Sequence, residues 1–98
     1  SDWGIGLLYP TAADVSISGR VLTADGRGIV NAIVTLRNQA GEIRTVQTGS
    51  FGYYAFDGVA SGQDYVISVI SRRFRFEQPE RLISVTDDIT GLDLTALP

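Results

Sequence analysis

Four residue types are missing from this 98-residue sequence: Cys, His, Lys and Met. Without His and Cys, neither a Ser-His-Asp nor a Cys-His catalytic arrangement can be assembled. A zinc site would have to use carboxylates alone, which zinc does not favour. We therefore expect no catalytic activity and no cofactor. The absence of Met leads us to expect a module of a longer polypeptide.

Long apolar runs and an excess of positive charge are also lacking. The eight Lys-plus-Arg residues are all Arg, and eleven acidic residues give a net charge of −3. A mildly acidic chain has no general attraction for nucleic acid or anionic lipid. No apolar run approaches the ~20 residues that a bilayer requires, so we expect no membrane insertion. Residues 4–9 (GIGLLY) are too short for the core of a signal peptide, and any export signal is expected upstream.

Short stretches of alternating apolar and polar residues dominate the sequence, which is 44% hydrophobic. Gly- and Asp-containing turns such as TADGRG separate these stretches, a pattern typical of all-β sandwiches. The predicted strands span 15–22, 32–37, 43–48, 52–56, 64–71, 74–77, 82–86 and 92–96. Residues 1–14 do not alternate, and we predict a linker or N-terminal arm there, followed by one domain over residues 15–98.

Five motifs carry a family resemblance: SGRV (18–21), DGRGI (25–29), NAIVTL (31–36), TGSFGYYAF (48–56) and YVISV (65–69). They resemble the carboxypeptidase regulatory-like domain, a transthyretin-like (prealbumin-like) antiparallel Greek-key β-sandwich. The resemblance implies seven or eight strands and an exported bacterial module that accompanies a catalytic domain without being one. Cna-B modules of pili and adhesins are looser relatives. Their Lys–Asn isopeptide bond cannot form here, because Lys is absent.

Several residues of these motifs have a structural interpretation. Gly52 is expected where a Cβ would clash or where φ is positive. Tyr54 should point to the opposite face from Tyr53, and Tyr65 resembles a tyrosine corner, with a buried ring and a hydroxyl bound to nearby backbone. The predicted structural positions are Gly19, Gly26, Ala32, Gly52, Tyr54, Phe56, Gly62 and Tyr65.

The segment SRRFRF (71–76) is the sharpest candidate for ligand contact. Arg73 and Arg75 alternate with Phe74 and Phe76, so a strand would present guanidinium groups on one face and rings on the other. Such a face could bind sulfated or carboxylated glycans. The alternative, which we favour, is a strand whose Phe residues enter the core while its Arg residues discourage edge pairing.

Two further candidate contacts remain open. Trp3, with its apolar neighbours, either packs on a neighbouring domain or copy or lies along its own sandwich. Tyr53 is a candidate aromatic for a sugar-facing surface.

Acidic residues near the turns provide the remaining candidates for chemistry. Asp87-Asp88, or Asp57 with Asp64, could act as an acid–base pair. These four residues with Asp25 could also supply oxygens to calcium. No D-x-D-x-D-G loop occurs, and Asp is common in turns because its side chain binds local backbone amides. We favour this structural role and predict no metal site.

The sequence favours a non-catalytic structural or accessory module of a larger secreted, cell-surface or periplasmic bacterial protein. Its expected partners are neighbouring domains of the parent chain and another protein or a glycan. The alternative is a carbohydrate-binding module that uses exposed aromatic and Arg side chains. The bacterial and exported parts of this expectation come from the resemblance.

Overall fold

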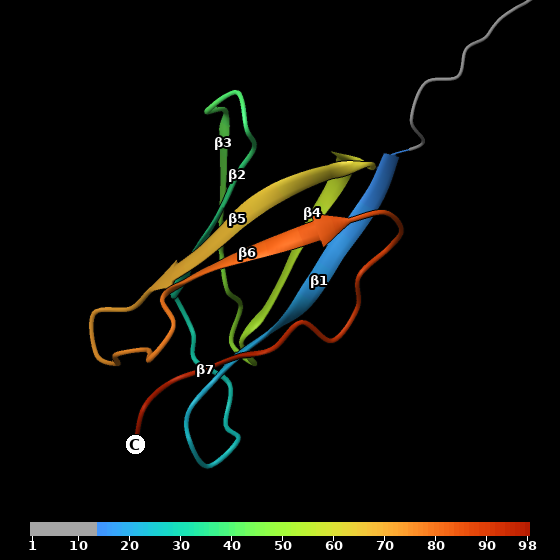
Figure 1. Cartoon of the computed structure of the whole chain (residues 1–98). Coiled ribbons are helices and arrows are strands. Elements are labelled where there is room, and N and C mark those ends of the chain that lie inside the picture. The colour runs from blue at the N-terminus through green and yellow to red at the C-terminus, as the bar shows by residue number, and fades with distance from the viewer. Residues whose placement is uncertain (1–13) are drawn as a thin grey trace, which may run out of the picture.

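The computed structural model describes residues 14–98, which form seven β-strands connected by turns and loops (Figure 1). The strands are β1 (Asp14–Leu22), β2 (Ile33–Arg37), β3 (Ile43–Gln47), β4 (Tyr53–Ala60), β5 (Gln63–Ile70), β6 (Glu80–Val85) and β7 (Leu94–Thr95). Within residues 14–98 there is no helix with the length and hydrophobicity needed to cross a membrane. The prediction of an arm over residues 1–14 lies outside the described residues, except for Asp14, which begins β1.

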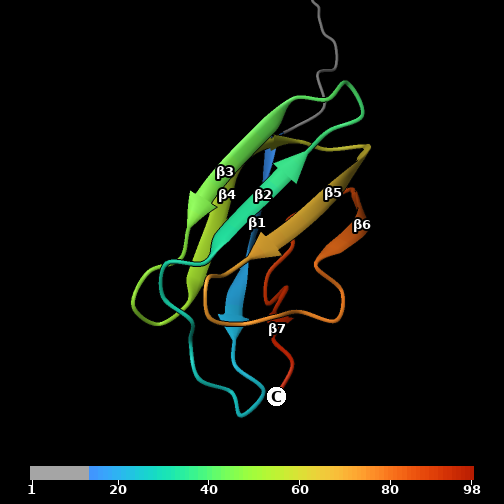
Figure 2. The same ribbon diagram turned by 90° about the vertical axis from the view of Figure 1, so that its left-hand side faces the viewer.

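The strands form two sheets that face each other (Figures 1 and 2). The small sheet has the order β4-β1-β7 and the large sheet the order β3-β2-β5-β6. The chain passes from one sheet to the other at the β1–β2, β3–β4, β4–β5 and β6–β7 connections. The predicted sandwich is confirmed. All named strand pairs are antiparallel except β1 and β7, which run parallel.

The core lies between the sheets because alternate residues of the long strands are apolar. In β5, Tyr65, Ile67 and Val69 are buried, while the intervening residues face outward. The Phe56 ring is fully buried and meets the Tyr54 ring edge-on, with 6.1 Å between ring centroids. The buried apolar residues are Val15, Ile17, Val21, Ile29, Ala32, Val34, Leu36, Tyr54, Phe56, Val59, Tyr65, Ile67, Val69, Val85, Leu94 and Ala96.

The predicted strand over residues 74–77 is wrong, because this segment is part of the β5–β6 loop. It lies beyond the end of β5, whose ladder with β6 covers Gln63 to Ser68, so no strand is available for regular pairing. The Arg75 carbonyl accepts one hydrogen bond from the Leu97 amide at 2.7 Å. Phe74 and Phe76 nevertheless pack against the core, while the side chains of Arg73 and Arg75 stay exposed.

Two other strands, β4 and β7, each differ in length from the prediction by three residues. β4 continues to Ala60 because a register shift opposite β1 accommodates the Asp57-Gly58 pair, where Gly58 has φ 64°. β7 is only two residues long, because the segment before it folds against β1.

The close approach of the C-terminal segment to β1 requires glycine at position 19. Ile17 pairs with Ile89 and Val21 with Leu94, so the C-terminal segment contains one more residue than β1 between these pairs. The backbone at Leu92 therefore folds over Gly19, and a Cβ there would overlap the Leu92 carbonyl group. The Tyr54 hydroxyl donates to the same carbonyl oxygen at 2.6 Å.

Gly52 directly precedes β4, which pairs with β1 on the other side from β7. Its φ is 82°, which side chains rarely adopt, and a Cβ would overlap the Val21 carbonyl oxygen. The Gly52 carbonyl accepts a hydrogen bond from the Val21 amide at 2.8 Å. At the opposite end of the sandwich, the buried Tyr65 ring lies beside the β4–β5 turn at Gly62 (φ 80°), and its hydroxyl donates to the Ala60 carbonyl oxygen at 2.7 Å.

Candidate functional site

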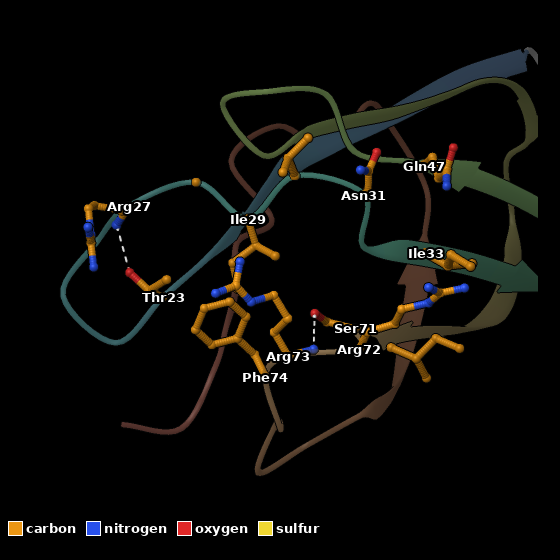
Figure 3. Close-up of a pocket in the computed structure, with 13 residues that line it drawn as sticks. Thr23, Arg27, Ile29, Asn31, Ile33, Gln47, Ser71, Arg72, Arg73 and Phe74 are labelled. Atoms are coloured by element: carbon orange, nitrogen blue, oxygen red, sulfur yellow. Dashed lines mark hydrogen bonds between the residues drawn. The ribbon is translucent and has the colours of Figure 1, made fainter.

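The candidate functional site is a groove of about 930 Å³ at one end of the sandwich. The β1–β2 loop lines one side through Thr23 and residues 27–31, and the start of the β5–β6 loop lines the other through residues 71–74. The ends of three neighbouring strands of the large sheet also line the groove, at Ile33, Gln47 and Ile70. Ile33 and Gln47 are labelled in Figure 3.

Local hydrogen bonds shape the β1–β2 loop on the first side of the groove. The Thr23 amide donates to the Arg27 carbonyl oxygen at 2.7 Å, and the Thr23 hydroxyl oxygen accepts from the Arg27 amide at 3.0 Å. Gly26, at φ 91°, supplies the tight turn between them. The Thr23 hydroxyl also donates to the Asp25 carboxylate, which lies 3.3 Å from Arg27. The Thr23 hydrogen bond and then the Arg27 charge lower the pKa of Asp25.

Thr48 fixes the rest of this loop to the large sheet. It is the one buried polar side chain of residues 14–98, at 3% exposure. Its hydroxyl donates to the Ile29 carbonyl oxygen at 2.6 Å and accepts from the Ala32 amide at 3.0 Å. Between these two residues Asn31 adopts φ 61°. Thr48 starts the TGSFG motif, but this role was not among the predictions from the sequence.

Positive charge and apolar surface meet in the groove. Arg27, Arg72 and Arg73 line it, and no Asp or Glu of the described residues does. Val30 and Ile70 contribute apolar surface, with 51% and 63% of their area exposed. In Figure 3 the Arg72 side chain extends toward Ile33, while Arg73 extends toward Ile29. The groove is thus suited to a ligand with both carboxylate and aliphatic groups.

The four predicted contact residues do not share one site. Arg73 lines the groove and Arg75 does not, while Trp3 lies outside the described residues. Tyr53 lies on the outer face of the small sheet, where the Arg20 guanidinium is stacked 4.8 Å from the ring centroid. The same guanidinium donates two hydrogen bonds to the Phe51 carbonyl oxygen, at 3.1 and 2.9 Å.

Sequence reasoning missed Arg27 and Arg72 as partners of Arg73. The available signals were the arginine of the DGRG turn and the Arg72-Arg73 doublet. Neither signal shows that the two loops lie at the same end of the sandwich, because that depends on strand order.

The carboxylates considered for chemistry are dispersed, and three of them accept hydrogen bonds from separate partners. The Asp64 carboxylate accepts from the Ser84 hydroxyl at 2.8 Å, and that of Asp88 from the Ser16 amide at 2.9 Å. The Asp87 carboxylate accepts from the amide of its neighbour Asp88 at 2.8 Å. Among residues 14–98, no three acidic side chains are grouped so that they could hold a metal ion.

Charge is distributed unequally between the two ends of the sandwich. The strand pairings place most acidic residues at the end where β1 begins and most arginines at the groove end, where β1 finishes. The acidic end contains Asp14, Glu42, Asp57, Asp64, Asp87 and Asp88, and the groove end contains Arg20, Arg27, Arg72, Arg73 and Arg75.

Comparison with protein families gives one match over most of the chain. Residues 16–96 match the model of the carboxypeptidase regulatory-like domain. No curated protein matches this sequence.

Solved structures with the same fold include parts of two bacterial proteins. The Bacillus anthracis TIE protein superposes with a TM-score of 0.70 at 16% identity, over 85% of this chain and 16% of that one. The C-terminal fragment of the pilus adhesin SpaC from Lactobacillus rhamnosus GG superposes with a TM-score of 0.68 at 14% identity, over 89% of this chain and 46% of that fragment. This chain therefore spans less than half the length of either, and the likeness concerns the fold.

Proposed function

Because this chain belongs to the carboxypeptidase regulatory-like domain family, we propose that it is a non-catalytic structural module of a larger secreted or cell-surface bacterial protein. It spaces and orients neighbouring domains of that protein and makes contacts with them.

The observation that carries this proposal is the position of the two ends of the described chain. Asp14 pairs with Ala60 at the acidic end, whereas Thr95 pairs with Leu22 at the groove end. Figure 1 shows the start of the first strand and the C-terminus at opposite ends of the sandwich. Nine residues of β1 span ~30 Å at about 3.3 Å per residue. Domains attached at the two ends would be held apart by roughly this length.

The proposed location and lack of catalysis have separate support. A pilus adhesin is among the proteins with the same fold, which favours a surface location. The chain lacks the His and Cys residues of common nucleophilic sites, and the groove contains no carboxylate of the described residues.

The carbohydrate-binding alternative has weaker support. Sugar platforms need an exposed aromatic face, but Arg20 covers one face of the Tyr53 ring. Phe74 and Phe76 pack against the core.

A distance measurement tests the spacer role. Residues 1–98 would be inserted between two folded reporter domains that each carry one spin label. The distance between the labels would be measured by pulsed electron–electron double resonance. We expect one narrow distance distribution. A Gly/Ser linker of equal length is the control, and it should give a broad one. A distribution as broad as that of the linker would contradict the proposal.

A further inference from the structure

We infer that the groove binds an extended acidic peptide segment of a partner domain, with carboxylates on one side and aliphatic side chains on the other. This inference rests on the proposed function, since it specifies the chemistry of one contact that such a module makes. The groove combines positive charge with exposed apolar surface and lacks an exposed aromatic platform among the described residues.

The arginines of the groove provide the first argument. Among residues 14–98, neither Arg72 nor Arg73 has a carboxylate within 4.0 Å, whereas Arg27 has Asp25. A bound carboxylate would supply the counter-charge that these two guanidinium groups do not receive from residues 14–98. Each guanidinium can also hold a carboxylate through two parallel hydrogen bonds. A chain with net charge −3 that gathers three of its eight cations around one groove thus favours an anionic ligand there.

The apolar surface of the groove narrows the class of anion. Ile70 and Val30 are more than half exposed, and they lie beside the arginines. A phosphate ion or a densely sulfated glycan would leave these side chains in water. A peptide of alternating acidic and aliphatic residues would satisfy both surfaces, because successive side chains of an extended chain point to opposite sides.

The aromatic content of the groove argues against a saccharide. Phe74 is the one aromatic residue of the described lining, and its ring is packed against the core. A sugar ring would therefore lack an exposed platform on which to stack. An extended peptide does not need an exposed aromatic ring in order to bind in the groove.

Titration of the whole 98-residue chain with short peptides tests the inference. The probe is Ac-(Glu-Leu)₃-NH₂, and binding is followed by amide chemical shifts. We expect the largest shifts at residues 27–31 and 70–74. Ac-(Gln-Leu)₃-NH₂ and Ac-(Glu-Ser)₃-NH₂ should each bind about tenfold more weakly, because one lacks the charge and the other the aliphatic side chains.

Paired variants separate local recognition from net charge. Arg72→Gln with Arg73→Gln should weaken binding of Ac-(Glu-Leu)₃-NH₂ by about tenfold or more. Arg37→Gln with Arg44→Gln removes the same charge near the other end of the sandwich and should change the affinity by less than about twofold. Circular dichroism of both double variants confirms that they remain folded.

Four outcomes would overturn the inference. These are equal loss in the two double variants, absence of binding by all peptides, tighter binding of hexagalacturonate than of any peptide, and self-association of the chain through the groove. None of them alters the distance distribution that tests the spacer role. Conversely, a broad distance distribution leaves a positive peptide titration intact.

Discussion

The two sheets of the sandwich are held together in different ways. In the small sheet, the C-terminal segment lies so close to β1 that a Cβ at Gly19 would overlap backbone atoms. The large sheet is a regular antiparallel ladder of four strands, stabilised by apolar side chains such as Ile67 and Val69. Its outer face carries exposed apolar residues, including Leu82 at 73% exposure.

The two sheets should therefore tolerate different kinds of substitution. The small sheet should be sensitive to added atoms, because backbone meets backbone there. The large sheet should be sensitive to removed atoms on its inner face and indifferent to changes on its outer face.

The largest effect is expected from Gly19→Ala. The new Cβ would overlap the Leu92 carbonyl group, and the backbone of either segment must move. We expect a loss of about 4 kcal/mol or more in the free energy of unfolding, measured by urea denaturation. Gly49→Ala is the control, because Gly49 has no positive φ and a Cβ there meets nothing within 4 Å. Similar losses in both variants would contradict the proposed role of close backbone contact.

Ile67→Ala tests the large sheet by removal. Ile67 is 1% exposed at the centre of the core, so the variant leaves a cavity. We expect a loss of about 3 kcal/mol in the free energy of unfolding, and about 1 kcal/mol for Ile67→Val. A loss for Ile67→Ala below that of Gly49→Ala would remove the distinction between the sheets.

Tyr54→Phe tests the close contact in the small sheet through the pH dependence of stability. The Tyr54 hydroxyl donates to the Leu92 carbonyl oxygen, and losing this bond should cost about 1–2 kcal/mol. Burial, with the nearby Asp93 charge, raises the pKa of Tyr54 above its ordinary value of about 10. The folded state then holds this proton more tightly than the unfolded state. The contribution of Tyr54 to stability is therefore fully present below pH ~10 and is lost progressively as the pH rises above that value.

Urea denaturation at several pH values between about 8 and 12 would measure this loss. The absence of Lys, Cys and His leaves few other side chains that titrate in the range. Tyr53→Phe is the control, since Tyr53 is 62% exposed. If Tyr54→Phe retains the full alkaline slope of the parent, Tyr54 is not its source.

The smallest effect is expected from Leu82→Thr on the outer face of the large sheet. Threonine keeps the β propensity at an exposed position, so stability should change by less than about 0.5 kcal/mol. Thermal unfolding monitored by circular dichroism would measure the change. A loss above about 1 kcal/mol would mean that the outer face contributes to stability as the core does.

The strands of this fold could be predicted where alternation alone decides the structure. In β1 and β5, every second residue is apolar and buried, and the predicted bounds agree with the structure within about two residues. The alternation of 74–77 predicted a strand that does not form, because a strand also needs a neighbour with free backbone groups. The close approach at Leu92 joins positions 73 residues apart, and no local pattern in the sequence indicates it.

The groove could be predicted only in part for the same reason. The SRRFRF segment drew attention to Arg73, and its Phe residues do pack inward. Arg27 joins it because the β1–β2 and β5–β6 loops emerge at one end of the sandwich. Thr48 supports the β1–β2 loop through hydrogen bonds with Ala32 and Ile29, which lie 16 and 19 positions earlier in the chain.

The parallel pairing of the first and last strands determines how the domain would respond to tension. A pull on both termini draws β1 and the C-terminal segment in opposite directions along their shared axis. The bonds from Ser18 to Ile89, Leu92 to Ser18 and Ala96 to Leu22 would then be strained together in shear and not broken one after another. Such a junction resists force until all of its hydrogen bonds break together. This behaviour suits a link that must keep its length under load.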